Sequence, residues 1–268
     1  MIKRKMKLTD IFEITKPDVN GRCTTGTKVY EDSQFECLTL KPGQEKAAAF
    51  LESRKYAAYK GATTEFRKEE GLTYDKESNA LYVAISTIDK SMEDNYKGSE
   101  PTNHIRLEKN ICGAVYKVSL DENHSGTKME AIVVGKPLEV GDTYADEWGC
   151  HPDNIANPDN ITYIGHNILL INEDSKYHVN NMSWAYNTQT ETMTRIASLS
   201  IGGEVTGVDS AVVDGKGILL INTQHPFKDN PKAADGSKPN SALIERASDE
   251  QLKATIGYFD GLPSDIFY

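Results

Sequence analysis

The chain lacks the signatures of several large protein classes. Its apolar runs, such as Ile168–Ile171 and Ile218–Ile221, are far shorter than the ~20 residues that a membrane-spanning helix needs. Lysine and arginine occupy much of residues 3–7, but no apolar stretch follows them, so the chain contains no export signal of the usual form. The net charge of −10 argues against a basic face for nucleic acid. We therefore expect no transmembrane segment and no nucleic-acid partner.

Familiar catalytic motifs are missing as well. The sequence has no glycine-rich phosphate loop, no dinucleotide fingerprint, no G-x-S-x-G elbow and no C-x-x-C pair. It has four cysteines, Cys23, Cys37, Cys112 and Cys150. An even number would allow disulfides in an oxidising compartment, but four in 268 residues is also ordinary for reduced core thiols. We expect the reduced form.

The pattern of apolar and turn-forming residues changes near residue 64. Before it, an N-terminal extension over 1–63 contains one predicted helix at 43–60, bounded by Pro-Gly and Gly. After it, short β-type runs separated by Gly, Asn and Asp turns fill a second domain over 64–268. Its last part, 228–268, is predicted to be a tail with a short helix that a capping pattern at Ser248 begins.

Three segments of the second domain look alike, because each starts with an acid, forms a strand, turns at Asn or Gly, and returns as an apolar strand. They are Glu70–Ala84, Asp159–Ile171 and Glu204–Ile221. The second and third starts are 45 residues apart, and the first and second are 89 apart, about two such steps. The strands of 113–120 and 130–134 are expected to supply the skipped unit. This period is typical of β-propeller blades and predicts an all-β fold with four to five blades and a peripheral helix.

In a propeller the first strand of each blade lines the central channel, so acids at equivalent positions converge. We predict a shared metal site made of Glu70, Asp159, Glu173 and Glu204. Calcium takes six to eight oxygen ligands of this kind, and Fe³⁺ also prefers oxygen. Lys68, close to Glu70, could contact a phosphoryl oxygen. The alternative is that these acids only cap turns where strands begin.

Many short stretches, in order, are similar to the PhoX-type alkaline phosphatase family. They are Leu40–Gly43, Phe50–Arg54, Tyr56–Ala58, Gly61–Gly71, Asn110–Tyr116, Pro158–Asn160, Glu173–Asp174, Asn180–Trp184, Gly203–Gly207 and Asn222–Pro226. The resemblance runs from about residue 37 to 227. It implies a six-bladed propeller with a mixed iron and calcium cluster that hydrolyses small phosphate monoesters, in the periplasm or outside the cell.

The resemblance also assigns roles to single residues. Glu70 matches the acid of the family's R-x-E-G motif and would be a calcium ligand. Lys68 stands where that motif has its phosphate-contacting arginine, and would be the catalytic contact, with the charge but without the bidentate fork. Asp159 matches the ligand of the P-D-N motif, and Glu173 and Glu204 lie in family motifs.

Family members are longer, and the additional length precedes residue 37, where the family has its iron-ligating cysteine. We therefore expect an incomplete six-bladed ring here, completed by an upstream region or a second chain. With ligands missing, the chain alone is expected to bind calcium weakly and to show little phosphatase activity. Two alternatives are a non-catalytic calcium-binding propeller fragment and a calcium-dependent lactonase-type hydrolase.

Overall fold

The structure of the chain, a computed structural model, describes residues 5–31, 34–97 and 102–262. Contacts divide it into two compact units, the first made of 1–66 and 90–108, the second of 67–89 and 109–268. The chain thus leaves the second unit at residue 90, returns to the first, and re-enters the second at 109. The sequence placed this whole excursion in a loop of the β domain. No helix in the described ranges is long and apolar enough to cross a membrane.

The first unit contains a three-stranded antiparallel sheet in the order β1-β3-β2, together with short helices. Its elements are α1 (Leu8–Ile11), β1 (Phe12–Thr15), β2 (Thr27–Glu31), β3 (Gln34–Leu40), α2 (Glu45–Leu51), α3 (Ser53–Tyr59) and the 3₁₀ helix η1 (Lys90–Met92). The predicted single helix over 43–60 is wrong. The backbone leaves the helical region at Glu52, with φ −135° and ψ 41°, so two helices form. Phe12, Leu38 and Ala48 are central to this unit's core.

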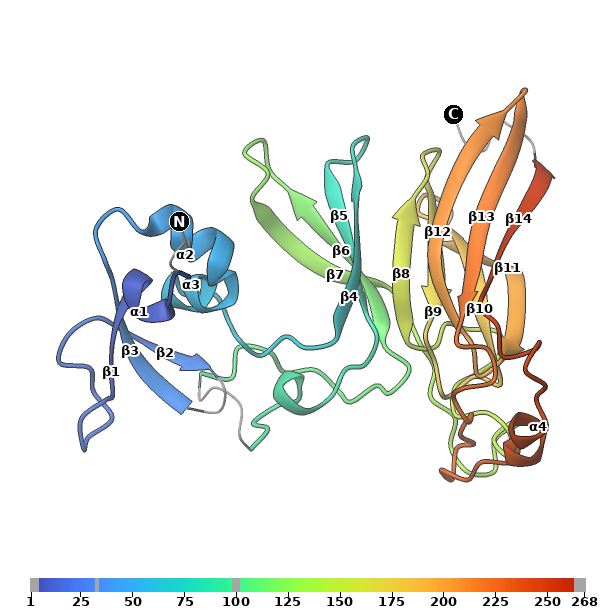
Figure 1. Cartoon of the computed structure of the whole chain (residues 1–268), viewed down its shortest axis with the longest axis horizontal. Helices are drawn as coiled ribbons and strands as arrows, with labels where there is room; N and C mark the ends of the chain where they lie inside the picture. The colour runs from blue at the N-terminus through green and yellow to red at the C-terminus, as the bar shows by residue number, and fades with distance from the viewer. Residues whose placement is uncertain (1–4, 32–33, 98–101, 263–268) are drawn as a thin grey trace. The chain divides into compact units, whose positions relative to one another are not determined.

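The described part of the second unit forms three antiparallel sheets, here called sheets I, II and III (Figure 1). Sheet I has β4 (Glu69–Asp75), β5 (Ala80–Ile85), β6 (Ala114–Leu120) and β7 (Gly126–Val134); sheet II has β8 (Pro158–Tyr163), β9 (Ile168–Glu173), β10 (Asn180–Asn187) and β11 (Thr192–Ile201); sheet III has β12 (Glu204–Val213), β13 (Lys216–Gln224) and β14 (Thr255–Leu262). The all-β class is therefore confirmed. The three look-alike segments are the hairpins β4–β5, β8–β9 and β12–β13.

The described residues of the second unit form three sheets where four to five blades were predicted. The strands near 115 and 130 are β6 and β7, which pair onto β5 and complete sheet I. The long connection between β5 and β6 stretches sheet I over two of the assumed 45-residue steps. Closure of the sheets into a propeller ring stays a prediction.

The C-terminal segment also differs from the prediction. Residues 255–262 form β14, which pairs with β13 and adds a strand to sheet III. The capping contacts at Ser248 do form, since Gln251 N donates to Ser248 Oγ and Ser248 N to Gln251 Oε1, but the chain makes only a turn there. The short helix of this region is α4, Ser241–Glu245, instead.

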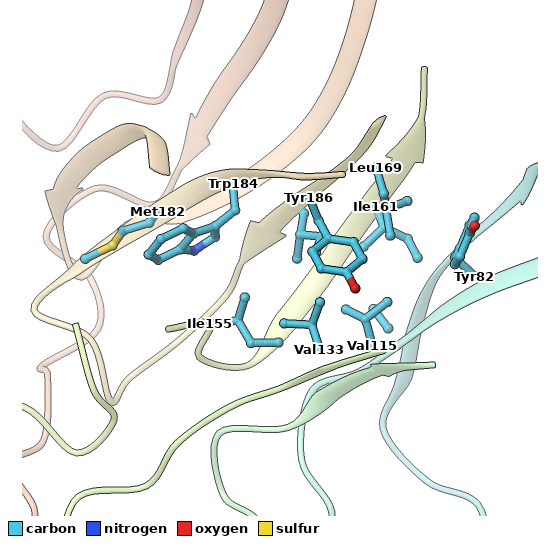
Figure 2. Close-up of a cluster of buried hydrophobic side chains, with 11 residues drawn as sticks. Tyr82, Val115, Val133, Ile155, Ile161, Leu169, Met182, Trp184 and Tyr186 are labelled. Atoms are coloured by element: carbon cyan, nitrogen blue, oxygen red, sulfur yellow. The ribbon is translucent and has the colours of Figure 1, made fainter. Parts of the chain in front are cut away.

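The first strands of the three sheets lie side by side. Tyr163 N of β8 donates to Thr73 Oγ1 of β4 at 3.1 Å, and Thr162 Oγ1 of β8 donates to Val208 O of β12 at 3.1 Å. Apolar side chains fill the space between the sheets. Figure 2 shows Val115 and Val133 of sheet I facing side chains of sheet II in one cluster. A second cluster joins sheets II and III.

All four cysteines are in disulfides, so the expectation of reduced thiols is wrong. Cys23 pairs with Cys37 in the first unit, and Cys112 pairs with Cys150 in the second. The paired Cα atoms are 5.6 and 6.0 Å apart, within the range that a disulfide spans. The partners are 14 and 38 residues apart in sequence, so no short motif revealed the pairing.

Candidate functional site

A β-bulge occurs near the start of the first strand of each sheet. The regular pairing is interrupted between Glu69 and Leu72 in β4, between Pro158 and Ile161 in β8, and between Thr206 and Val208 in β12. Bulges turn side chains away from the regular alternation and often border functional sites. Aligned on the bulges, Glu70 is equivalent to Asp159 and to Thr206. Glu204, which the sequence period had matched to them, lies two residues earlier.

The position two residues before Glu70 is also repeated. It is occupied by Lys68, Asn157 and Glu204 in sheets I, II and III. Lys68 and Asn157 both have left-handed backbones, with φ of 57° and 43°. Asparagine tolerates this conformation, whereas for a lysine it costs about 1 kcal/mol. A strained lysine in a pocket is a reason to suspect a functional side chain.

A close approach of β4 and β8 brings the two bulges together. Gly71 lies directly after Glu70, and a Cβ atom on it would be 2.3 Å from the backbone oxygen of Asp159. Asn160, the equivalent residue of β8, accepts a hydrogen bond from Gly207 N at 3.1 Å and donates one to the carboxylate of Asp159. Two glycines and one amide thus allow the N-terminal ends of the three first strands to lie close together.

A polar pocket of about 350 Å³ opens at these strand entries. Its charged lining residues are Arg67, Lys68, Lys109, Lys176, Glu70, Asp89, Asp159, Asp174 and Asp229. A neighbouring pocket of about 360 Å³ shares Glu70 and Asp159 with it and reaches Gly207 of β12. Glu70 and Asp159 therefore lie where the two pockets meet.

Two ion pairs hold cations of the pocket in place. Lys68 Nζ is 3.0 Å from Glu70 Oε1, and Ser86 Oγ donates to the same carboxylate oxygen at 3.2 Å. Arg67 NH1 is 3.0 Å from Asp89 Oδ1. The Lys68 side chain stays half exposed, so its remaining donors can reach a ligand in the pocket.

The unpaired carboxylates of the pocket repel one another. Burial raises the pKa of Asp174 to about 6, and the charges of Glu204, Asp159 and Asp229 add to this effect. Burial also raises the pKa of Asp159, with Glu70 and Glu204 contributing in the same direction. Lys68 acts against both shifts. Negative charge is thus concentrated around Lys68, which is favourable for a bound cation.

Asn157 fixes the pocket wall between sheets I and II. This buried side chain donates to Ser86 O at 2.5 Å and to Ile111 O at 2.7 Å, and accepts from Ser175 Oγ at 2.7 Å. Its backbone oxygen accepts from Asp174 N at 3.2 Å. Ser86, which follows β5, and Asp174, which follows β9, are thereby held on either side of the pocket.

Glu173 does not line this pocket. Its carboxylate is fully buried, and its two oxygens accept four hydrogen bonds, from Ala156 N, Met182 N, Trp184 Nε1 and His178 Nδ1, at 2.7 to 3.0 Å. These bonds join sheet II to the loop before β8. Of the predicted residues, the structure brings Lys68, Glu70 and Asp159 into the pocket, and Glu204 near it.

The sequence analysis missed Asp229 and Asn157; it placed Asp174 among the candidate oxygen ligands but did not select it for the shared metal site. Asp174 was visible as the neighbour of Glu173, and strand alternation places such neighbours on opposite faces of a sheet. Asp229 follows β13 by five residues and carried no signal in the sequence. Asn157 stands directly before the P-D-N motif, but only the structure shows its buried contacts.

The donor chemistry suits one of the two expected metals. The pocket oxygens of Glu70, Asp159 and Asp174 are ligands of the kind that calcium prefers. The raised pKa values of Asp159 and Asp174 show that their negative charge is not fully compensated. In the described ranges, however, no three His, Cys, Asp or Glu side chains are close enough to hold a metal ion as they stand. An iron site with a thiolate ligand does not fit, because all four cysteines are in disulfides.

No family model and no curated protein matches this sequence. Among solved structures, the chain is similar to Pseudomonas fluorescens PhoX in complex with vanadate, described as a transition state analogue. The TM-score is 0.54 at 20% identity, and the match covers 81% of this chain and 37% of the PhoX chain. This similarity supports a PhoX-like fold. The chain spans little more than a third of that protein's length.

Proposed function

We propose that this chain binds the phosphoryl group of a small phosphate ester in the pocket, as part of a PhoX-like metal-dependent phosphomonoesterase. One observation carries the proposal. In a fold similar to a vanadate-binding protein, the repeated strand entries place the strained Lys68 among the carboxylates of Glu70, Asp159 and Asp174.

Lys68 is the proposed contact to the phosphoryl group. A phosphate oxygen would compete with Glu70 for the ammonium, which has donors to spare. Arg67, held by Asp89 in the same pocket, is placed to add a second cation. Phosphate-monoester hydrolysis is among the slowest uncatalysed reactions, so such fixed charges must lower a large barrier.

Calcium is the proposed metal. Glu70, Asp159 and Asp174 would hold it, with Glu204 adding negative charge nearby. The bound ion would neutralise the carboxylates and stabilise negative charge on the phosphoryl group. Because these side chains do not form a three-ligand group as they stand, calcium binding would require them to move together.

Two disulfides support a proposed location in the periplasm or outside the cell, because disulfides persist in oxidising compartments.

The test measures binding and turnover in the same preparations. The melting temperature of the chain is recorded with calcium, with a chelator, and with vanadate in each condition, beside turnover of an aryl phosphate. We expect calcium to raise the melting temperature by mass action and vanadate to raise it further. Lys68→Asn should abolish the vanadate effect while leaving the fold intact, because asparagine occupies the equivalent left-handed position 157. Lys76→Asn, at an exposed turn of the β4–β5 hairpin, is the matched control.

If neither vanadate nor inorganic phosphate changes the melting curve with calcium present, the proposed function is wrong. A calcium effect without any phosphate effect would favour the non-catalytic calcium-binding alternative.

A further inference from the structure

Sheets I, II and III pack on one another in that order, and equivalent positions of their first strands differ in burial. The residue directly after the bulge of the first strand is Leu72 in sheet I, Ile161 in sheet II and Val208 in sheet III. Their exposed fractions are 62%, 6% and 9%. Ile161 lies in the cluster between sheets I and II, and Val208 in the cluster between sheets II and III. Leu72 is thus exposed where its equivalents cover a preceding sheet.

In the second strands the order is reversed, and the exposed member belongs to sheet III. Tyr82, Leu170 and Leu220 are equivalent residues of the second strands, with exposed fractions of 0%, 2% and 38%. Tyr82 packs on sheet II, its ring 6.0 Å from that of Tyr163, and Leu170 packs on sheet III. Leu220 is the member with no following sheet in the part of the chain that the structure describes. Tyr258, its neighbour on β14, is 66% exposed.

These two surfaces correspond to the two sides that pack together at each internal junction between sheets. We call the face of sheet I that carries Leu72 and Tyr74 the leading face, and the face of sheet III that carries Leu220, Tyr258 and Ile256 the trailing face. Each internal junction packs the leading side of one sheet on the trailing side of the sheet before it. Tyr163, which stacks on Tyr82, is equivalent to Tyr74.

We propose that a second copy of this chain docks its leading face on the trailing face of the first, and so continues the internal sheet-on-sheet junction between molecules. The occupant is a second copy because the chain itself exposes an apolar leading face of the kind that two internal junctions already use. The contact is heterologous, so it joins copies head to tail and closes a ring or extends a filament according to the rotation between sheets.

Charge modulates this association. Each copy has a net charge of −10, so two copies repel at low ionic strength. Salt screens this repulsion, with a Debye length of about 10 Å at 0.1 M and about 3 Å at 1 M. The apolar contact itself is not weakened by salt. Association is therefore stronger at high salt than at low salt, which is opposite to the behaviour of an interface held by ion pairs.

Sedimentation velocity of the 268-residue chain over a range of concentrations and salt tests the proposal. Leu220→Asp places a carboxylate in the apolar trailing face, and Leu72→Asp places one in the leading face. Each variant alone should associate at least about tenfold more weakly, because a buried unpaired carboxylate opposes the contact. A mixture of the two variants retains one intact pair of faces and should form a heterodimer. Val140→Asp, 74% exposed in the loop after β7, is the matched control and should behave as wild type.

Formation of the heterodimer from two monomeric variants supports the head-to-tail contact. A wild-type chain that stays monomeric at about 100 µM in high salt overturns the proposal, as does a mixture that does not associate while the wild type does. Circular dichroism of each variant establishes that the mutated sheets are folded. None of these outcomes depends on the proposed phosphate site.

Discussion

At the scale of single residues, the structure separates two neighbouring acids that the sequence treats alike. Glu173 and Asp174 are adjacent, but Glu173 is sealed by four donors, while Asp174 faces the pocket with a raised pKa. The same carboxylate chemistry therefore serves the stability of sheet II in one case and the candidate site in the other.

Glu173→Gln should destabilise the second unit by about 3 kcal/mol, because it removes a buried charge that four donors face and turns one acceptor into a donor. Urea unfolding measures the change, and Glu147→Gln on the exposed loop should stay within about 0.5 kcal/mol of wild type. If Glu173→Gln were as stable as wild type but lost the calcium-induced rise in melting temperature, Glu173 would be a metal ligand after all.

Asp174→Asn should stabilise the metal-free chain near pH 7 and have no such effect near pH 4. Because the folded pKa of Asp174 is raised to about 6, the linked stability is fully present below its unfolded pKa of about 4. It is lost as the pH rises from about 4 to 6, where the folded state resists ionisation.

Removing this carboxyl should therefore gain on the order of 1 kcal/mol above pH 6, after allowance for solvent screening. Urea unfolding at both pH values, with a chelator present, gives the comparison. Asp146→Asn, on an exposed loop, is the control. An equal gain at pH 4 and pH 7 would show that the effect is not electrostatic.

At the scale of elements, the hairpins were predictable and their register was not. Alternating apolar residues and Asn or Gly turns identify β4–β5, β8–β9 and β12–β13 from local sequence alone. Aligned on the bulges, Asp159 and Thr206 are equivalent and 47 residues apart, so a fixed period of 45 matched Glu204 to Asp159 instead. The long connection after β5 likewise hid the four-stranded sheet I.

Gly71→Ala tests the close approach of β4 and β8. The added Cβ would be 2.3 Å from Asp159 O, so the strands must separate, and we expect a loss of about 2 kcal/mol in the free energy of unfolding. Gly257→Ala in β14 is the matched control, because the nearest atom to its added Cβ is 4.0 Å away. Equal stability of the two variants would mean that the first strands of sheets I and II are not in contact at this point.

At the scale of the whole molecule, the disulfides and the division into two units were decided by tertiary structure. Each unit contains one disulfide. Cys112–Cys150 lies behind the pocket wall, packed with Ala156 and against Ile111 and Tyr177. We expect it to stabilise the second unit, including the pocket.

Replacing Cys112 and Cys150 by alanine should cost the second unit about 4 kcal/mol, according to the loop-entropy model for a 38-residue separation. The two tryptophans, Trp148 and Trp184, both belong to the second unit, so their fluorescence reports its unfolding alone. The matched Cys23→Ala, Cys37→Ala variant affects the first unit and should leave this fluorescence transition in place. An unchanged transition in the first variant would contradict a structural role for its disulfide.

The sequence by itself determined the all-β class, the three hairpins and the candidate residues Lys68, Glu70 and Asp159, because strand alternation, turn chemistry and short motifs are local properties. Only the tertiary structure decided which cysteines pair, which of Glu173 and Asp174 faces the pocket, and how the bulges set the register. The physical reason is that these features depend on contacts between strands distant in the chain, and a shift of one residue turns every side chain of a strand to the other face.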